Sequence, residues 1–286
     1  MRAIVATLSL LAATSAFAAN FSGASALEFA KRAVACGPRP PGSEANKKLQ
    51  TYIASQVKLD GAELIEDAFI AKTPKGEIAM KNIIAKFPGK SGKAIVITGH
   101  FDTKLFPDRK FVGANDGGSS TGLLLELARV MAHQPRTDDL YLVWFDGEEA
   151  IREEWEGDDN LYGSRHLAER WRKDGMLGRV KALINVDMIG DKHLNIKQET
   201  QSNARLRQLV WATAAELGYK AYFVDETISE DDDHMPFVRM GVPALDIIDV
   251  DYPPWHKDED TMDKIGAQSL DIVGTVVQEV IHRLER

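Results

Sequence analysis

Cysteine is nearly absent from this chain of 286 residues, because Cys36 is the only one. A single thiol excludes an intramolecular disulfide and a metal site built from several thiolates. A nucleophilic role would need a nearby histidine base and a lowered thiol pKa, and the neighbouring residues 37–42 indicate a turn instead. Any metal site in this protein must therefore use histidine, aspartate and glutamate.

Excess positive charge and long hydrophobic runs are also lacking. The chain has 35 lysines and arginines against 43 aspartates and glutamates, a net charge of -8. No basic patch stands out, so nucleic acid is not an expected partner. Beyond the first residues no apolar run approaches the ~20 residues that a spanning helix needs. No repeat or low-complexity linker divides the chain, and no feature specifies an oligomeric state.

The N-terminus has the pattern of a secretory signal peptide. Arg2 supplies the positive start, residues 4–13 form a short apolar core, and residues 15–19 are small except for Phe17. We therefore expect a cleaved signal peptide over residues 1–19 and a catalytic domain over residues 20–286. The mature protein is expected to be secreted or periplasmic, with no membrane insertion after signal removal.

The hydrophobic pattern predicts an α/β fold in a single domain. Continuous apolar runs at 94–98, 140–145, 182–186 and 244–248 predict buried central strands, preceded by strands at 63–71 and 78–87. Helical spacing occurs at 25–35, 43–57, 119–133, 162–173, 203–217 and 267–284. Strands that alternate with helices predict a mostly parallel central sheet flanked by helices.

Polar residues follow several of these strands directly. His100 follows the run 95–98, the pair Glu148 and Glu149 follows 140–145, and Asp187 follows 182–186. His256 lies in the loop after 244–248. In open α/β sheets, functional sites form outside the carboxyl ends of the strands, so these residues are expected to share one edge of the sheet.

The residue types suit a zinc centre. Zinc accepts histidine nitrogen and carboxylate oxygen, and catalytic sites keep three protein ligands and an open position. Asp116, which precedes the predicted helix at 119–133, completes one such set with Glu149 and His256. His100 and Asp187 could complete a second metal site with Asp116 as the bridge, so both one zinc ion and two remain open.

The neighbour of a metal ligand is well placed to move protons. Glu148 and Glu149 leave the same strand in different directions, so one can bind metal while Glu148 acts as general base. Asp102, two residues after His100, could hydrogen-bond a metal-bound imidazole. Taken alone, a strand-end cap would explain Asp187 and a turn would explain Asp102.

Together these motifs resemble the zinc-dependent glutaminyl-peptide cyclotransferases of the animal type, the glutaminyl cyclases, which are relatives of the di-zinc aminopeptidases. The general pattern, common to both groups, comprises His100-Phe101-Asp102, Asn115-Asp116, Glu148-Glu149, Asp187 and His256. The segments closer to the cyclases are Phe111-Val112-Gly113-Ala114, Phe145-Asp146-Gly147-Glu148-Glu149-Ala150 followed by Trp155, Leu161-Tyr162-Gly163-Ser164-Arg165-His166-Leu167-Ala168, Asp232-Asp233-His234-Met235-Pro236-Phe237 and Trp255-His256. The resemblance covers nearly all of the mature chain.

The resemblance implies a role for each site residue. One zinc would be bound by Asp116, Glu149 and His256, and Glu148 would carry the proton. Asp232 would assist at the leaving amide, with Asp187 in a supporting hydrogen-bond network, and Trp155 and Trp255 would wall the pocket. The implied reaction is cyclisation of N-terminal glutaminyl residues of peptides or proteins to pyroglutamate with release of ammonia.

The related aminopeptidases supply the alternative. Gly117 and Gly118 after Asp116 are closer to that group, and one extra residue separates the glutamate pair from Trp155. A secreted zinc aminopeptidase would hydrolyse N-terminal residues of peptides. In that case His100 and Asp187 would hold a second zinc and Glu148 would activate a water molecule, so the number of metal ions distinguishes the two hypotheses.

Overall fold

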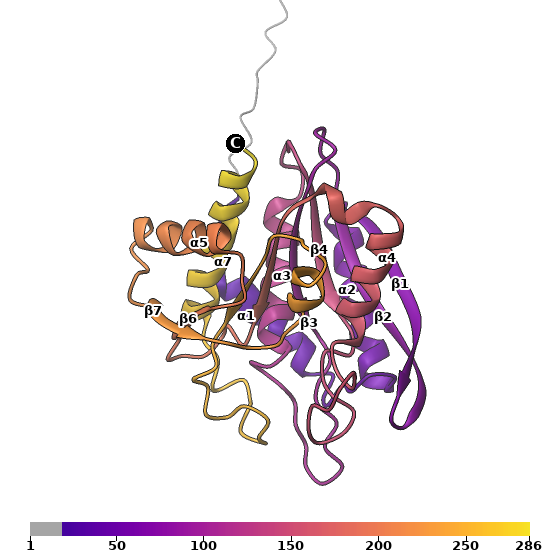
Figure 1. Cartoon of the computed structure of the whole chain (residues 1–286). Coiled ribbons are helices and arrows are strands. Elements are labelled where there is room, and N and C mark those ends of the chain that lie inside the picture. The colour runs from indigo at the N-terminus through magenta and orange to yellow at the C-terminus, as the bar shows by residue number, and fades with distance from the viewer. Residues whose placement is uncertain (1–18) are drawn as a thin grey trace, which may run out of the picture.

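A six-stranded sheet forms the centre of the molecule (Figure 1). The computed structural model describes residues 19–286. The strands follow the order β1 (Glu63–Thr73), β2 (Gly76–Phe87), β4 (Asp139–Phe145), β3 (Ala94–His100), β5 (Val180–Asp187) and β8 (Ala244–Ile248) across the sheet. β4, β3, β5 and β8 are parallel to one another, while β1 and β2 are antiparallel to their neighbours. The mostly parallel sheet predicted from the sequence is confirmed.

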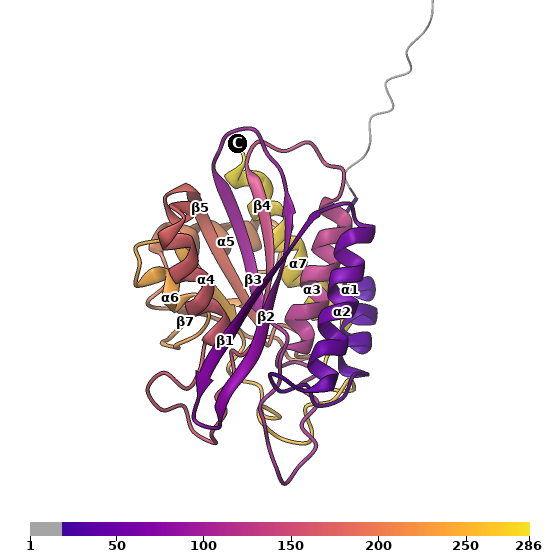
Figure 2. The same ribbon diagram turned by 90° about the vertical axis from the view of Figure 1, so that its right-hand side faces the viewer.

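Side chains alternate between the two faces of the sheet and supply two cores. Ile95 and Ile97 pack with α1 (Gly23–Val34), α2 (Glu44–Leu59), α3 (Gly118–Met131), α5 (Ala204–Glu216) and α7 (Ala267–Leu284). Val96, between them, points to the opposite face, where α4 (Tyr162–Lys173) and α6 (Met235–Val238) pack. Figure 2 shows α1, α2 and α3 on one side of the sheet and α4 and α6 on the other. A sheet covered on both faces explains why its strands are continuously apolar.

Serine caps fix the first two helices. Ser22 precedes α1 and accepts a hydrogen bond from the backbone N–H of Ser25, and Ser43 precedes α2 and accepts one from Asn46. These bonds satisfy donors that the first helical turn leaves unpaired. α4 and α7 have the predicted bounds, and the other predicted helices differ from the observed ones by up to two residues at either end.

A second, small sheet escaped the sequence analysis. β6 (Ile196–Glu199) and β7 (Phe223–Ile228) pair in parallel beside the main sheet. β6 is only four residues long, and the middle of β7 is exposed, so neither shows an alternating apolar pattern. The helix α6 and the 3₁₀ turn Met176–Arg179 were also missed, because they are too short to show a helical pattern of apolar residues.

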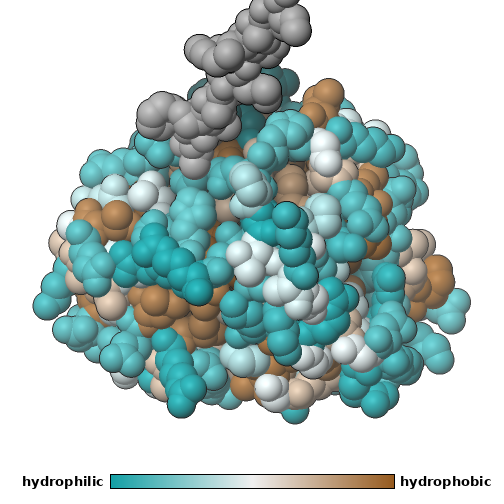
Figure 3. All heavy atoms as spheres, turned by 90° about the horizontal axis from the view of Figure 1, so that it is seen from above, coloured by the Kyte–Doolittle hydropathy of each residue, from teal (hydrophilic) through white to brown (hydrophobic). Residues whose placement is uncertain are grey.

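The surface at the end that carries the C-terminus is mostly hydrophilic, with small hydrophobic patches between polar side chains (Figure 3). Over residues 19–286, none of the helices combines the length and the apolar character needed to cross a membrane. The predicted signal peptide lies, apart from Ala19, outside the described residues.

Candidate active site and metal centre

The predicted polar residues gather at the carboxyl end of the parallel strands. His100 and Asp187 are the last residues of β3 and β5. Glu148 and Glu149 follow β4, and His256 lies in the loop after β8. In Figure 1 the loops after β3 and β4 lie at the lower end of the sheet, away from the C-terminus. The loops at this edge of the sheet surround a cavity of about 520 Å³. The cavity is lined by Phe106, Arg109, Asp116, Glu148, Glu149, Glu153, Glu154, Trp155, Asp187, Met188, Glu230, Asp231, Asp232, Ile248, Trp255 and His256.

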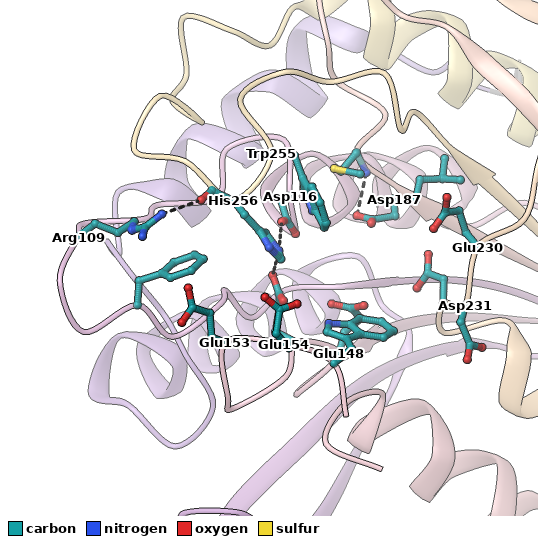
Figure 4. Close-up of a pocket in the computed structure, with 16 residues that line it drawn as sticks. Arg109, Asp116, Glu148, Glu153, Glu154, Asp187, Glu230, Asp231, Trp255 and His256 are labelled. Atoms are coloured by element: carbon teal, nitrogen blue, oxygen red, sulfur yellow. Dashed lines mark hydrogen bonds and ion pairs between the residues drawn. The ribbon is translucent and has the colours of Figure 1, made fainter. Parts of the chain in front are cut away.

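Asp116, Glu149 and His256 form one donor set. One ligand atom from each lies within 4.8 Å of the other two. His256 Nε2 lies 3.1 Å from Glu149 Oε1 and 3.4 Å from Asp116 Oδ2, and Figure 4 shows the side chains of Asp116 and His256 pointing toward one another. The geometry brings together the three residues that the sequence predicted as ligands of one metal ion.

His100, Asp116 and Asp187 form a second donor set that shares Asp116. His100 Nε2 lies 3.1 Å from Asp116 Oδ1 and 3.2 Å from Asp187 Oδ1. The two carboxylate oxygens of Asp116 therefore face different partners, Oδ2 toward His256 and Oδ1 toward His100. This is the arrangement expected of a bridging ligand, and it gives the chain the side chains for two adjacent metal positions.

The first set fits a divalent cation by its chemistry. Asp116 Oδ2 and Glu149 Oε2 are buried and find no hydrogen-bond donor among residues 19–286. Burial raises the pKa of Glu149, and nearby Asp116 adds to this effect. Burial also opposes ionisation of Asp116, but the neighbouring imidazoles of His100 and His256 outweigh it and hold the pKa of Asp116 well below its usual range. Two carboxylates and an imidazole with free acceptor capacity are a ligand set for a borderline metal.

Glu148 is placed beside this set without belonging to it. Its carboxylate lines the cavity and lies 3.9 Å from His100 Nδ1, too far for a hydrogen bond. Burial raises its pKa well above the usual value for glutamate, and Glu149 and Asp232 raise it further, while His100 opposes the shift. A carboxyl group with a raised pKa is suited to accept and return a proton near neutral pH.

Asp102 holds the two glutamates in place through their backbone. Its Oδ1 accepts a hydrogen bond from the N–H of Glu148 at 3.2 Å, and its Oδ2 accepts one from Glu149 at 3.4 Å. The same carboxylate lies 3.5 Å from His100 Nδ1, but no hydrogen bond joins the two side chains in the described residues. Asp102 therefore connects the loops that follow β3 and β4.

Asp232 enters the cavity from the loop before α6. Asn185 on β5 donates a hydrogen bond of 2.8 Å to Asp232 Oδ2 and another of 3.1 Å to Asp246. Burial raises the pKa of Asp232 to about 6, and Asp187 adds to the shift. The predicted pair Asp187 and Asp232 is thus close enough for mutual electrostatic influence.

The two predicted aromatic walls stand at the mouth of the cavity. Both Trp155 and Trp255 line it, and they are 37% and 52% exposed. Trp255 stacks on the ring of His256 at a centroid distance of 4.2 Å. Large indole surfaces left open to solvent beside a polar site indicate a surface that a ligand covers.

Three positioning residues were missed by the sequence analysis. Asp260 accepts hydrogen bonds from the N–H groups of Asn115 and Asp116 at 2.8 and 3.2 Å. Arg39, fully buried, donates to the carbonyls of Phe101 and Gly113 and so ties the loop after β3 to the N-terminal region. Lys104, 1% exposed, places its ammonium 4.0 Å from Glu149 Oε2. The sequence gives no local signal for such long-range contacts.

Fold and site together define a class: an α/β enzyme with a candidate carboxylate and histidine metal centre at the carboxyl edge of a mostly parallel sheet. The family model described as Peptidase family M28 matches residues 82–281. The chain belongs to this family.

Relatives and solved structures agree with this assignment. The glutaminyl-peptide cyclotransferase of Bos taurus is 30% identical and the match covers 84% of this chain and 76% of the relative. The glutaminyl cyclase of an Acidobacteriales bacterium is 39% identical with a TM-score of 0.90, covering 97% of this chain and 99% of that structure. A leucine aminopeptidase precursor of Bacteroides thetaiotaomicron is 28% identical with a TM-score of 0.86, covering 93% and 98%.

Proposed function

We propose that this protein is a zinc-dependent glutaminyl-peptide cyclotransferase, which converts N-terminal glutaminyl residues of peptides or proteins to pyroglutamate and releases ammonia. The observation that carries the proposal is the cavity itself, in which Asp116, Glu149 and His256 converge beside Glu148 and under Trp155 and Trp255. Similarity to glutaminyl cyclases over nearly the whole chain supports it.

We infer that Asp116, Glu149 and His256 hold the zinc ion. When bound there, zinc polarises the side-chain carbonyl of the N-terminal glutamine. The α-amine nitrogen of the substrate forms a bond to that carbonyl carbon, and the bond to the amide nitrogen breaks. Glu148 takes a proton from the α-amine and returns it to the departing nitrogen, which leaves as ammonia.

The remaining pocket residues orient the substrate in this proposal. Asp232 accepts a hydrogen bond from the leaving amide, and Asp187 supports it from the end of β5. The walls formed by Trp155 and Trp255 hold both reacting ends of one residue together, which lowers the entropic cost of ring closure. They also keep water away from the carbonyl, and this favours cyclisation over hydrolysis.

A Gln-initiated peptide tests the proposal. The mature, zinc-loaded protein should release ammonia from the peptide and lower the peptide mass by about 17 Da. This is the mass of the one ammonia that leaves when the α-amine nitrogen replaces the side-chain amide nitrogen. The same peptide with N-terminal Asn in place of Gln is a matched control. Release of free amino acids with no ammonia would contradict the cyclase proposal.

The aminopeptidase alternative rests on a specific observation. His100 and Asp187 stand beside Asp116 as a second donor set, and similar structures include a leucine aminopeptidase precursor. In this case two metal ions would be held and Glu148 would take a proton from water, with the peptide bond as the target. Metal analysis of the active protein separates the alternatives: one ion per chain supports the cyclase, and two support the peptidase.

We also propose that residues 1–19 form an export signal, which is removed by cleavage after Ala18 or Ala19. The apolar segment 4–13 and the small residues before position 20 support this. N-terminal sequencing of the protein isolated from its producing cells should begin at Ala19 or Asn20. Recovery of an intact Met1 from the cytoplasmic fraction alone would contradict it.

A further inference from the structure

Four carboxylates surround the mouth of the cavity above the proposed catalytic groups. Glu153 and Glu154 come from the loop after β4, and Glu230 and Asp231 come from the loop after β7. Figure 4 shows the first pair on the side of Arg109 and the second pair beyond Asp187. Two separate loops therefore contribute negative charge on different sides of one opening.

Within residues 19–286, three of these carboxylates form no ion pair. Asp231 forms an ion pair with Arg239 at 2.8 Å, but no ion pair to Glu153, Glu154 or Glu230 exists within residues 19–286. Arg109, at the same mouth, interacts with Asp108 at 3.3 Å, and its guanidinium lies 4.5 Å from the ring centroid of Phe106. The rim thus has a net negative charge.

The floor of the cavity adds to this field. Glu149 lies there, 2% exposed, with its Oε2 buried and without a hydrogen bond among the described residues, 4.0 Å from Lys104 Nζ, and Glu148 lies beside it. A divalent ion held there would offset Asp116 and Glu149 but would leave the carboxylates of the rim. Carboxylates that line a cleft with low-dielectric walls focus the field and raise the local concentration of cations.

We propose that this acidic rim selects peptides whose second residue is lysine or arginine, an inference that rests on the proposed cyclase function. With a glutaminyl side chain in the inner cavity, the second residue would lie at the mouth, which Trp155 and Trp255 line. Long basic side chains from that position reach the carboxylates of Glu153, Glu154 and Glu230. An acidic second residue meets like charge instead.

Matched peptides test the selectivity. The zinc-loaded protein is assayed with Gln-Lys-Ala, Gln-Ala-Ala and Gln-Glu-Ala at low salt and at about 0.5 M salt. The expected kcat/KM for the lysine peptide exceeds that for the glutamate peptide by about tenfold at low salt, and salt reduces the ratio. Equal values for the two peptides at low salt would overturn the inference.

Two triple variants assign the effect to the rim. E153Q/E154Q/E230Q removes the three unpaired carboxylates and should bring the lysine-to-glutamate ratio near one. E28Q/E77Q/D225N removes three exposed carboxylates outside the residues that line the cavity and should retain the ratio of the unaltered protein. A ratio that persists in the rim variant, or that disappears equally in both variants, would overturn the inference.

Binding of product peptides separates this inference from the proposed function. Pyroglutamyl-Lys-Ala should bind more tightly than pyroglutamyl-Glu-Ala in calorimetry, and the difference should vanish in the rim variant. Failure of all three glutamine peptides to react would contradict the cyclase function, whereas equal binding of the two products would overturn the selectivity of the rim.

Discussion

Asp116 is the residue on which both donor sets depend. Its Oδ2 faces His256 and its Oδ1 faces His100, so one side chain serves two positions. The loop that carries it is fixed by Asp260, which accepts two backbone hydrogen bonds. Glu148 is expected to have a different role, because it lies in the same cavity but belongs to neither donor set. Substitutions at these two positions should therefore have different consequences.

Glu148→Gln should lower kcat/KM by about 10²–10⁴, the usual effect of losing a general base. The zinc content should stay unchanged, because Glu148 is not part of the proposed ligand set. Asp116→Asn is the matched comparison and should lose both bound zinc and activity. Loss of zinc in Glu148→Gln, measured by atomic emission after dialysis, would contradict the division of roles between the two carboxylates.

Lys104→Met should destabilise the metal-free protein and increase its stabilisation by zinc. The ammonium of Lys104 forms an ion pair with Glu149 Oε2 at 4.0 Å. Without this charge the buried carboxylates repel one another more strongly, and a bound cation relieves more repulsion. Thermal unfolding with and without zinc measures both effects. Lys220→Met, at an exposed site, should change neither value; an unchanged zinc effect in Lys104→Met would contradict the prediction.

The sequence predicted the site residues that stand at the ends of strongly apolar strands. His100, Glu149 and Asp187 were found in this way, because the carboxyl ends of parallel strands converge. Asp260, Arg39 and Lys104 were not found, because each acts on a residue that the fold alone brings near. Their roles depend on contacts across long stretches of chain, which no local pattern encodes.

Among the elements, α3 places Asp116 at the site. The helix begins at Gly118, and Gly117 before it has φ +76°, a conformation that glycine adopts without strain. A Cβ atom at Gly117 would lie 2.6 Å from the carbonyl oxygen of Asp102 and 3.0 Å from His100 Cε1. The helix thus starts against two segments that carry site residues.

Gly117→Ala should lower the free energy of unfolding by about 1–3 kcal/mol, the cost of a left-handed conformation in a residue with a side chain. It should also lower kcat/KM, because the new methyl group displaces the ring of His100. Gly178→Ala, where a Cβ meets nothing within 4 Å, is the control and should leave activity unchanged. Urea unfolding measures the stability, and a Gly117→Ala protein as stable and active as the control variant would rule out this role.

Buried strands were easier to predict from the sequence than strands with exposed residues. The four parallel strands β3, β4, β5 and β8 are buried almost throughout and were recognised from continuous apolar runs. β6 and β7 lie beside the main sheet, and the solvent-exposed middle of β7 carries polar residues. Their strand conformation comes from pairing with each other, a tertiary effect that overrides local preference.

For the molecule as a whole, metal binding and protonation are coupled through His256. Burial opposes protonation of this imidazole, but Glu149 and Asp116 outweigh it and raise its pKa to about 10. In the metal-free protein this raised pKa stabilises the fold below pH about 6.5, the unfolded value. That contribution is lost as the pH rises through about 10. A metal ligand, by contrast, must be the neutral imidazole.

Zinc binding should therefore release protons, and zinc affinity should rise with pH by about tenfold per unit between pH 6 and 9 for each proton released. The stability gained from zinc, about 4 kcal/mol at a free concentration a thousand times Kd, should grow over the same range as the metal-free protein loses the His256 contribution. Thermal unfolding with zinc and with a chelator at several pH values measures this difference in stability between the zinc-bound and the metal-free protein. Calorimetry in two buffers of different ionisation enthalpy counts the protons. His256→Ala should show a smaller pH dependence of the stability gained from zinc. If the stability that the unaltered protein gains from zinc stays constant from pH 6 to 9, His256 does not release a proton when zinc binds.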